Sequence, residues 1–165
     1  RLPGEYEWLR EAIGEYIEEE MGHQEWVLND IEACGGDKEA VRLSATETVS
    51  ASHATEIMVA YAYDMIHRVN PLGFFGMVLV LEGTSIAVAT QAAEKIMVNL
   101  KLPKQAFTYL ASHGSLDISH VTFFERLMNK IEIRTDQQII IHAAKRFYKL
   151  YGDVFRYVEA ISEAH

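Results

Sequence analysis

Apolar residues recur at intervals of three and four along most of the chain, which is the period of helices with one buried face. Alternation flanked by hairpin turns, which would indicate strands, is not visible. The three prolines, Pro3, Pro71 and Pro103, each stand where a helix could begin. The pattern predicts five long helices, at about 5–34, 46–68, from Pro71 to 99, from Pro103 to 131, and from the Thr135-Asp136 pair to 159.

The boundaries of these helices carry their own signals. A glycine pair at 35–36 closes the first helix, Asn70-Pro71 ends the second, and Thr135-Asp136 is an N-cap for the fifth. Five long helices with short connections predict an all-α bundle. Without a repeat or a linker, residues 1–165 are expected to form a single domain. Its start at Arg1 rather than methionine predicts that N-terminal residues are lacking.

The charge and cysteine content exclude several classes of function. The 165 residues include 15 Lys and Arg against 24 Asp and Glu, a net charge of −9 without a basic run, so nucleic acid is not an expected partner. The single cysteine, Cys34, excludes an intramolecular disulfide and a multi-cysteine zinc site. With no signal-peptide pattern, a cytoplasmic location is expected.

The segment 72–93 is long enough to span a membrane and holds one charge, Glu82. That charge lies in mid-segment, and Thr84, Ser85, Thr90 and Gln91 add polar cost. A buried central helix explains the segment better, so no membrane partner is expected.

Polar residues interrupt the apolar stripes at a few positions. On the first helix Glu20 and His23 continue the series that begins at Leu9 and ends at Ile31. On the fourth helix a histidine, an aspartate and a second histidine follow at i, i+4 and i+7, again on one face. The ionisable residues predicted to point inward are Glu20, His23, Glu82, His113, Asp117 and His120.

Such a set indicates a metal site. Buried charges are normally paired or bound to a cation, and three carboxylates with three imidazoles do not neutralise one another readily. Carboxylates and neutral imidazoles suit two iron ions inside a helical bundle. Taken singly, each residue has an ordinary explanation: Glu20 could be solvated as Glu15, Glu18 and Glu19 are expected to be, and Glu82 could pair with Lys95.

Three sequence blocks resemble the heme-oxygenase-like iron-containing redox enzymes. The first is E-E-x-G-H at 19–23, followed by Trp26, Leu28 and Asp30; the second is N-P-x-G-F-x-G-x-x-x-V-L-E-G-T-S at 70–85; the third is H-G-S-L-D-I-S-H at 113–120. They follow the family's order over most of the domain. The same scaffold is shared by TenA-type thiaminases and PqqC-type oxidases.

The resemblance implies a helical bundle with a non-heme diiron centre that activates dioxygen. By matching motif, the six residues above would be its ligands, with Glu82 as the bridging, catalytically central carboxylate. Tyr16 departs from the family pattern, because many members carry a carboxylate there. A further helix usually lies upstream.

The leading hypothesis is therefore a diiron oxidase or oxygenase acting on a small organic substrate in an apolar pocket, with two irons per chain and dioxygen as co-substrate. Pocket candidates are Tyr61, Phe74, Phe75, Met77 and Phe124, although apolar residues at helical spacing more often belong to the core. Alternatives are a TenA-like metal-independent hydrolase using Cys34, a heme protein with one axial histidine, and a non-catalytic interaction domain. A homodimer is an expectation from general frequency alone.

Overall fold

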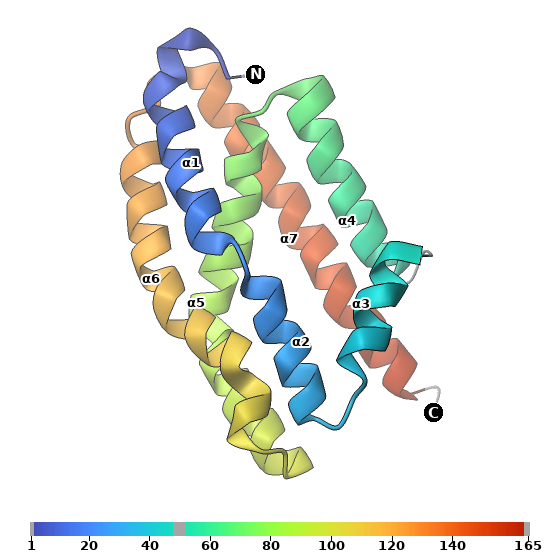
Figure 1. The fold of residues 1–165 in the computed structure, drawn as a ribbon. Helices are drawn as coiled ribbons and strands as arrows, with labels where there is room; N and C mark the ends of the chain where they lie inside the picture. Colours follow the sequence, from blue (N-terminus) through green and yellow to red (C-terminus); the bar gives the residue numbers. More distant parts are fainter. Residues whose placement is uncertain (1, 48–51, 164–165) are drawn as a thin grey trace. The chain divides into compact units, whose positions relative to one another are not determined.

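The computed structural model describes residues 2–47 and 52–163, with the side chains of 44–47, 115–117 and 159–163 set aside. Every regular element in this part is a helix (Figure 1), which confirms the all-α prediction. In chain order these are η1 (Gly4–Tyr6), α1 (Glu7–Glu20), α2 (His23–Ala33), α3 (Lys38–Glu47), α4 (His53–Asp64), η2 (Met65–Val69), α5 (Gly73–Leu100), η3 (Lys104–Phe107), α6 (Thr108–Met128) and α7 (Arg134–Glu163).

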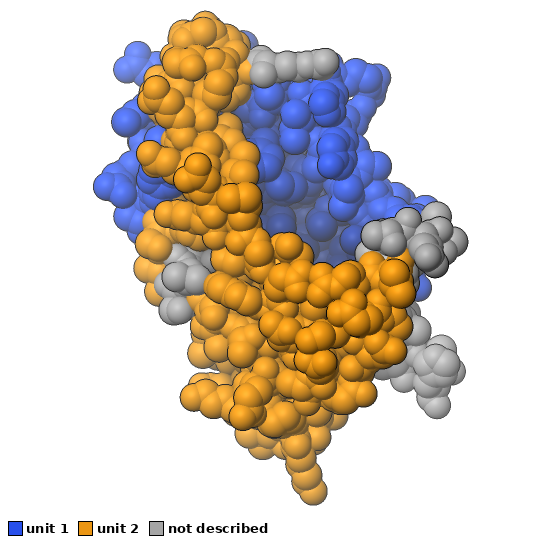
Figure 2. All heavy atoms as spheres, in the orientation of Figure 1, with its two compact units in different colours: residues 1, 51–83, 121–165 blue, residues 2–50, 84–120 orange. Residues whose placement is uncertain are grey.

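The chain divides into two compact units, coloured separately in Figure 2. Among the described residues, unit 1 comprises 52–83 and 121–163, and unit 2 comprises 2–47 and 84–120. Both α5 and α6 continue from one unit into the other, and a further passage between the units lies at residues 48–51, outside the described part of the chain. The prediction of one domain over 1–165 stays a prediction.

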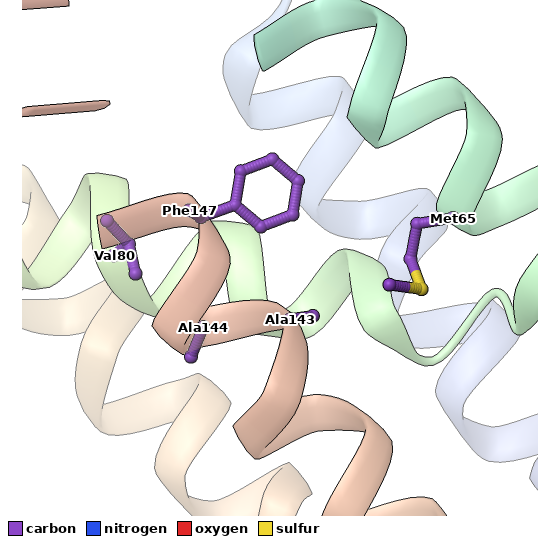
Figure 3. Close-up of a cluster of buried hydrophobic side chains, with 5 residues drawn as sticks. All are labelled: Met65, Val80, Ala143, Ala144 and Phe147. Atoms are coloured by element: carbon purple, nitrogen blue, oxygen red, sulfur yellow. The ribbon is translucent and has the colours of Figure 1, made fainter. Parts of the chain in front are cut away.

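The core of unit 1 joins three elements (Figure 3). Met65 from η2 and Val80 from α5 lie with three residues of α7, Ala143, Ala144 and Phe147. The Phe147 side chain is completely buried, and α4 packs along α7 beside it. Small residues on α7 let neighbouring helices approach closely, while the phenyl ring fills the space between them.

The first predicted helix, 5–34, is wrong in one respect: it is broken at Met21-Gly22 into α1 and α2. Met21 is extended, and Gly22 has φ of 94°, a left-handed conformation that glycine adopts without steric penalty. Its carbonyl then accepts the first hydrogen bond of α2, from the Glu25 amide at 2.9 Å. The predicted end is confirmed, because Gly35 is also left-handed, at φ 85°.

The sequence predicts no helix between 35 and about 46, but α3 covers Lys38–Glu47, and the expected start near Thr46 falls inside it. The remaining boundaries differ by smaller amounts: α4 begins at His53, capped by the Ser52 hydroxyl, which accepts from the Thr55 amide. Its last turn is the π-helix η2, which ends before Asn70 as predicted. The fifth helix starts at Arg134, one residue before the expected cap.

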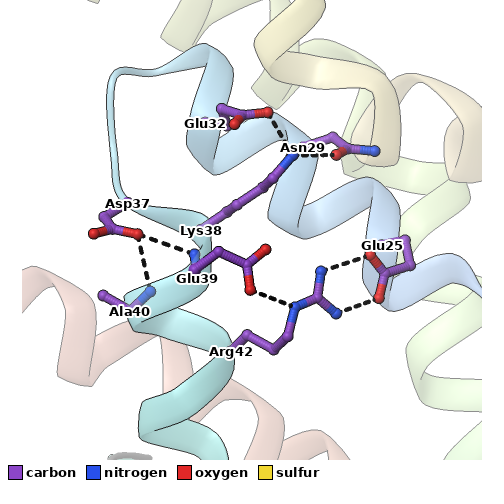
Figure 4. A network of polar contacts seen from close by, with 8 residues as sticks. All are labelled: Glu25, Asn29, Glu32, Asp37, Lys38, Glu39, Ala40 and Arg42. Carbon is purple, nitrogen blue, oxygen red and sulfur yellow. Dashed lines mark hydrogen bonds and ion pairs between the residues drawn. The ribbon is translucent and has the colours of Figure 1, made fainter.

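In unit 2, ion pairs tie α3 to α2 (Figure 4). The Arg42 guanidinium donates to both Glu25 oxygens, at 2.6 and 2.9 Å, and Lys38 Nζ lies 2.6 Å from Glu32. The hydrogen bond from Arg42 holds the pKa of the Glu25 carboxyl below its usual range. The carboxylate of Asp37 caps the first turn of α3. These contacts fix α3 against the helix that begins with His23.

By length and composition, α5 is the one helix of the described residues that could cross a membrane. Of its apolar window, 39% is buried within the protein, and core helices pass the same test. The expectation of no membrane partner stays a prediction.

Removing the Tyr61 hydroxyl should stabilise the protein. This hydroxyl is buried and has no hydrogen-bond partner among the described residues, and burial raises its pKa. The Tyr61 ring packs against the Phe147 ring, with centroids 5.0 Å apart. Tyr61→Phe removes an unsatisfied polar group, so the free energy of unfolding should rise by about 1 kcal/mol. Urea denaturation measures the change, and Tyr63→Phe, at an exposed ring, should have no effect. A loss of stability in Tyr61→Phe would contradict the buried, unpaired hydroxyl.

Candidate metal centre

The break between α1 and α2 brings Glu20 and His23 together. Glu20 ends α1 and His23 begins α2, with the left-handed Gly22 between them. Nδ1 of His23 lies 2.8 Å from Oε2 of Glu20. The two side chains are 28% and 13% exposed, so both face largely inward, as the sequence predicted.

His113 enters from α6 in a defined orientation. Its side chain is buried, and Nδ1 lies 2.9 Å from the carbonyl oxygen of Tyr109. A carbonyl only accepts, so Nδ1 must carry a proton and donate it. In the neutral ring Nε2 then holds the lone pair, which is the arrangement by which an outer hydrogen bond prepares a histidine for a metal.

Donor atoms of Glu20, His23 and His113 all lie within 4.8 Å of one another, in unit 2. Two aromatic rings flank the imidazoles. Trp26 stacks on His23 at 4.2 Å between centroids, and Tyr109 tilts over His113 at 4.0 Å. These rings restrict both the rotation of the imidazoles and the access of water.

Asp30, on α2, holds the start of α6, the helix that carries His113. Its carboxylate accepts from the Thr108 amide at 3.0 Å and from the Tyr109 amide at 2.9 Å, and also contacts the Thr108 hydroxyl. A residue of α2 therefore caps the N-terminus of α6, where negative charge is favourable. Asp30 thus sets the position of α6 relative to the helix that begins at His23.

His120, also buried, lies at the other side of Glu20. Its Nδ1 is 3.5 Å from Oε1 of Glu20, and its Nε2 is 3.1 Å from Oε2 of Glu19. Tyr16 presents its ring edge-to-face to His120, with centroids 5.6 Å apart. Glu20 therefore has one oxygen toward His23 and the other toward His120.

The remaining two candidates are placed as follows. Glu82 lies on α5 in unit 1 and is only 6% exposed, as a charge on an inward face should be. Asp117 lies on α6, four residues after His113, with its side chain outside the described part. Ligation by these two residues stays a prediction.

The residues of unit 2 fit a cation. Oε1 of Glu20 is a buried atom that lacks a hydrogen-bond partner among the described residues. An unsatisfied buried carboxylate oxygen is costly unless a positive charge meets it. Carboxylate oxygens and neutral imidazole nitrogens are ligands that iron accepts.

Comparison with known proteins agrees with this chemistry. A family model described as iron-containing redox enzyme matches residues 1–152 of the chain, which therefore belongs to that family. No curated protein and no solved structure gives a significant match. The family and the helical fold inferred from the three sequence blocks are thus confirmed.

The sequence does not predict two contacts of the centre, those of Asp30 with α6 and of Glu19 with His120. Asp30 belongs to the first of the three sequence blocks, but a cap for a helix 78 residues away leaves no local signal. Glu19 was assigned to the solvated face; its side chain is 62% exposed, yet it reaches His120. Its position beside the break at Gly22 could have raised the question.

Proposed function

We propose that this chain is a non-heme diiron oxidase or oxygenase that uses dioxygen to oxidise a small organic substrate. Its ligands would be the six residues singled out in the sequence, Glu20, His23, Glu82, His113, Asp117 and His120. The observation that carries the proposal is the convergence of Glu20, His23 and His113, whose donor atoms lie within 4.8 Å of one another, beside a buried Glu20 oxygen that has no hydrogen-bond partner among the described residues. The family supports iron as the metal.

The chain's own residues prepare the site. Bound ferrous iron supplies the one-electron chemistry that dioxygen requires. The Tyr109 carbonyl accepts a hydrogen bond from Nδ1 of His113, which leaves the lone pair of Nε2 available to a metal. Glu20 supplies negative charge between the two histidine groups, and the rings of Trp26 and Tyr109 exclude water from the imidazoles.

An apolar cavity in unit 1 supports a substrate with a largely hydrocarbon or aromatic body. Its volume is about 400 Å³, within the usual range for small-molecule sites. Phe75 and Phe124, two of the pocket candidates, line this cavity, and buried Glu82 forms part of its wall. Of the other pocket candidates, Tyr61 and Met77 pack against the core of unit 1, and Phe74 contacts Phe75.

The rival readings make different demands. A TenA-like hydrolase would need Cys34 as an activated nucleophile, but this residue is exposed at the end of α2, where its role is a helix boundary. If Cys34→Ser loses activity and removal of iron leaves the wild-type activity unchanged, the hydrolase would be favoured.

A cytoplasmic location and a small-molecule partner are part of our proposal.

Anaerobic titration with ferrous iron tests the proposal. We expect the wild-type chain to bind about two ions. Glu82→Gln should lose at least one of them while the metal-free protein stays folded, because the amide cannot supply the charge. The matched control is Glu125→Gln, a second acid on the same cavity, which should bind as wild type.

Failure of the well-folded wild-type chain to bind iron would contradict the proposed function. Unchanged iron binding with reduced stability in Glu82→Gln would instead identify Glu82 as part of a packing network.

A further inference from the structure

His120 lies between two consecutive carboxylates, and the outer one is not among the six predicted ligands. Nε2 of His120 is 3.1 Å from Oε2 of Glu19, and Nδ1 is 3.5 Å from Oε1 of Glu20. His120 is 8% exposed, whereas the Glu19 side chain is 62% exposed. Glu19 thus reaches from solvent to a buried imidazole.

The separation of Glu19 and His120 suits a shared cation. Bonds of about 2.1 Å from a divalent metal to nitrogen or oxygen place neighbouring ligands of an octahedral ion about 3.0 Å apart. We propose that Glu19 is a ligand of a divalent cation bound at Nε2 of His120, on the solvent-facing side of the centre. This rests on the metal centre proposed above.

The cation at His120 would be distinct from one at His23 and His113. His113 and His120 are seven residues apart on α6, which corresponds to about 10.5 Å along the helix axis. Glu20 lies between the two groups, with one oxygen toward His23 and the other toward His120. Glu19 supplies a further carboxylate where the outer ion would lie, which helps to balance the charge of that ion.

The exposure of Glu19 should affect how rapidly the cation at His120 exchanges with solvent. Because the Glu19 side chain is largely exposed to solvent, water can complete the coordination of an ion held there. The outer cation should therefore exchange more rapidly than the one enclosed by the rings of Trp26 and Tyr109. Tyr16, one turn earlier on α1, packs its ring against His120 and provides no carboxylate.

Cobalt(II) titration followed by calorimetry and visible absorption tests the assignment without relying on activity. The wild-type chain should bind two ions. Glu19→Gln should weaken the second by about tenfold or more and leave the first unchanged, because an amide is a poor ligand for a hard cation. Glu18→Gln, an adjacent exposed acid on α1, is the matched control and should behave as wild type.

A second measurement identifies the ligand atom. Zinc(II) should shift the ¹⁵N resonance of His120 Nε2 in the wild-type chain and in Glu18→Gln, with a smaller shift at equal zinc in Glu19→Gln. Two ions bound with equal affinity in Glu19→Gln and Glu18→Gln would overturn the role of Glu19 and leave the proposed function standing. A folded wild-type chain that binds no metal would overturn both.

Discussion

Replacing His113 by asparagine is expected to abolish most of the metal affinity while leaving the metal-free fold intact. The asparagine amide nitrogen can take the place of Nδ1 and still donate to the Tyr109 carbonyl. What disappears is Nε2, the ring nitrogen that the Tyr109 hydrogen bond leaves available to a metal, in a residue grouped with Glu20 and His23. Loss of a direct ligand should weaken binding by about 100-fold or more, since even outer hydrogen-bond partners of ligands account for about 10- to 100-fold.

Thermal unfolding with and without metal measures this loss. Metal at about 100 times its Kd stabilises the folded state by about 2.7 kcal/mol. For a chain of 165 residues this raises Tm by about 5–11 °C. In His113→Asn the same metal concentration should raise Tm by only about 1 °C. His142→Asn, at an exposed histidine of α7, is the control and should keep the full shift.

Equal metal-induced shifts in His113→Asn and His142→Asn would show that His113 is a buried structural histidine. Loss of the metal-free fold in His113→Asn would show that the imidazole itself, rather than its Nδ1 donor, stabilises α6. The metal-free Tm therefore has to be compared first.

Local signals were sufficient for most helix boundaries but not for the turn that builds the centre. Asn70-Pro71 and Gly35 stop helices by steric rules that act within a few residues, and both ends were predicted correctly. Gly22 acts differently, because glycine inside a periodic apolar pattern is also tolerated in a continuous helix. The spacing of Glu20 and His23 suited an unbroken helix, so the break was missed.

The site residues also divide into those that local sequence signals predict and those that depend on contacts between distant helices. Periodicity correctly placed Glu82, His113 and His120 among buried positions, because a buried face repeats along the helix that carries it. It could not reveal that Asp30 caps α6, since that contact depends on two helices distant in sequence. Nor could it reveal Glu19, whose exposed position is that of an ordinary surface residue.

The largest expected effect on stability comes from a single methyl group on α5. A Cβ added to Gly76 would lie 2.6 Å from the Ala144 amide nitrogen and 2.6 Å from the Ile140 carbonyl oxygen. These are backbone atoms of α7, so no side chain can rotate away and the two helices must separate. Gly76→Ala should lower the free energy of unfolding by about 3 kcal/mol, at the upper end of ordinary overpacking.

The same helix offers a matched control of opposite sign. A Cβ on Gly83 would meet no described atom within 4 Å beyond its neighbours in the same helix, so Gly83→Ala should gain about 0.5–1 kcal/mol from helix propensity alone. Urea denaturation followed by circular dichroism compares the two variants with wild type. Because both replace glycine by alanine in α5, intrinsic propensity favours each equally, and only contact with α7 can reverse the sign at Gly76. Equal stabilisation by both substitutions would therefore mean that α5 and α7 do not approach at Gly76.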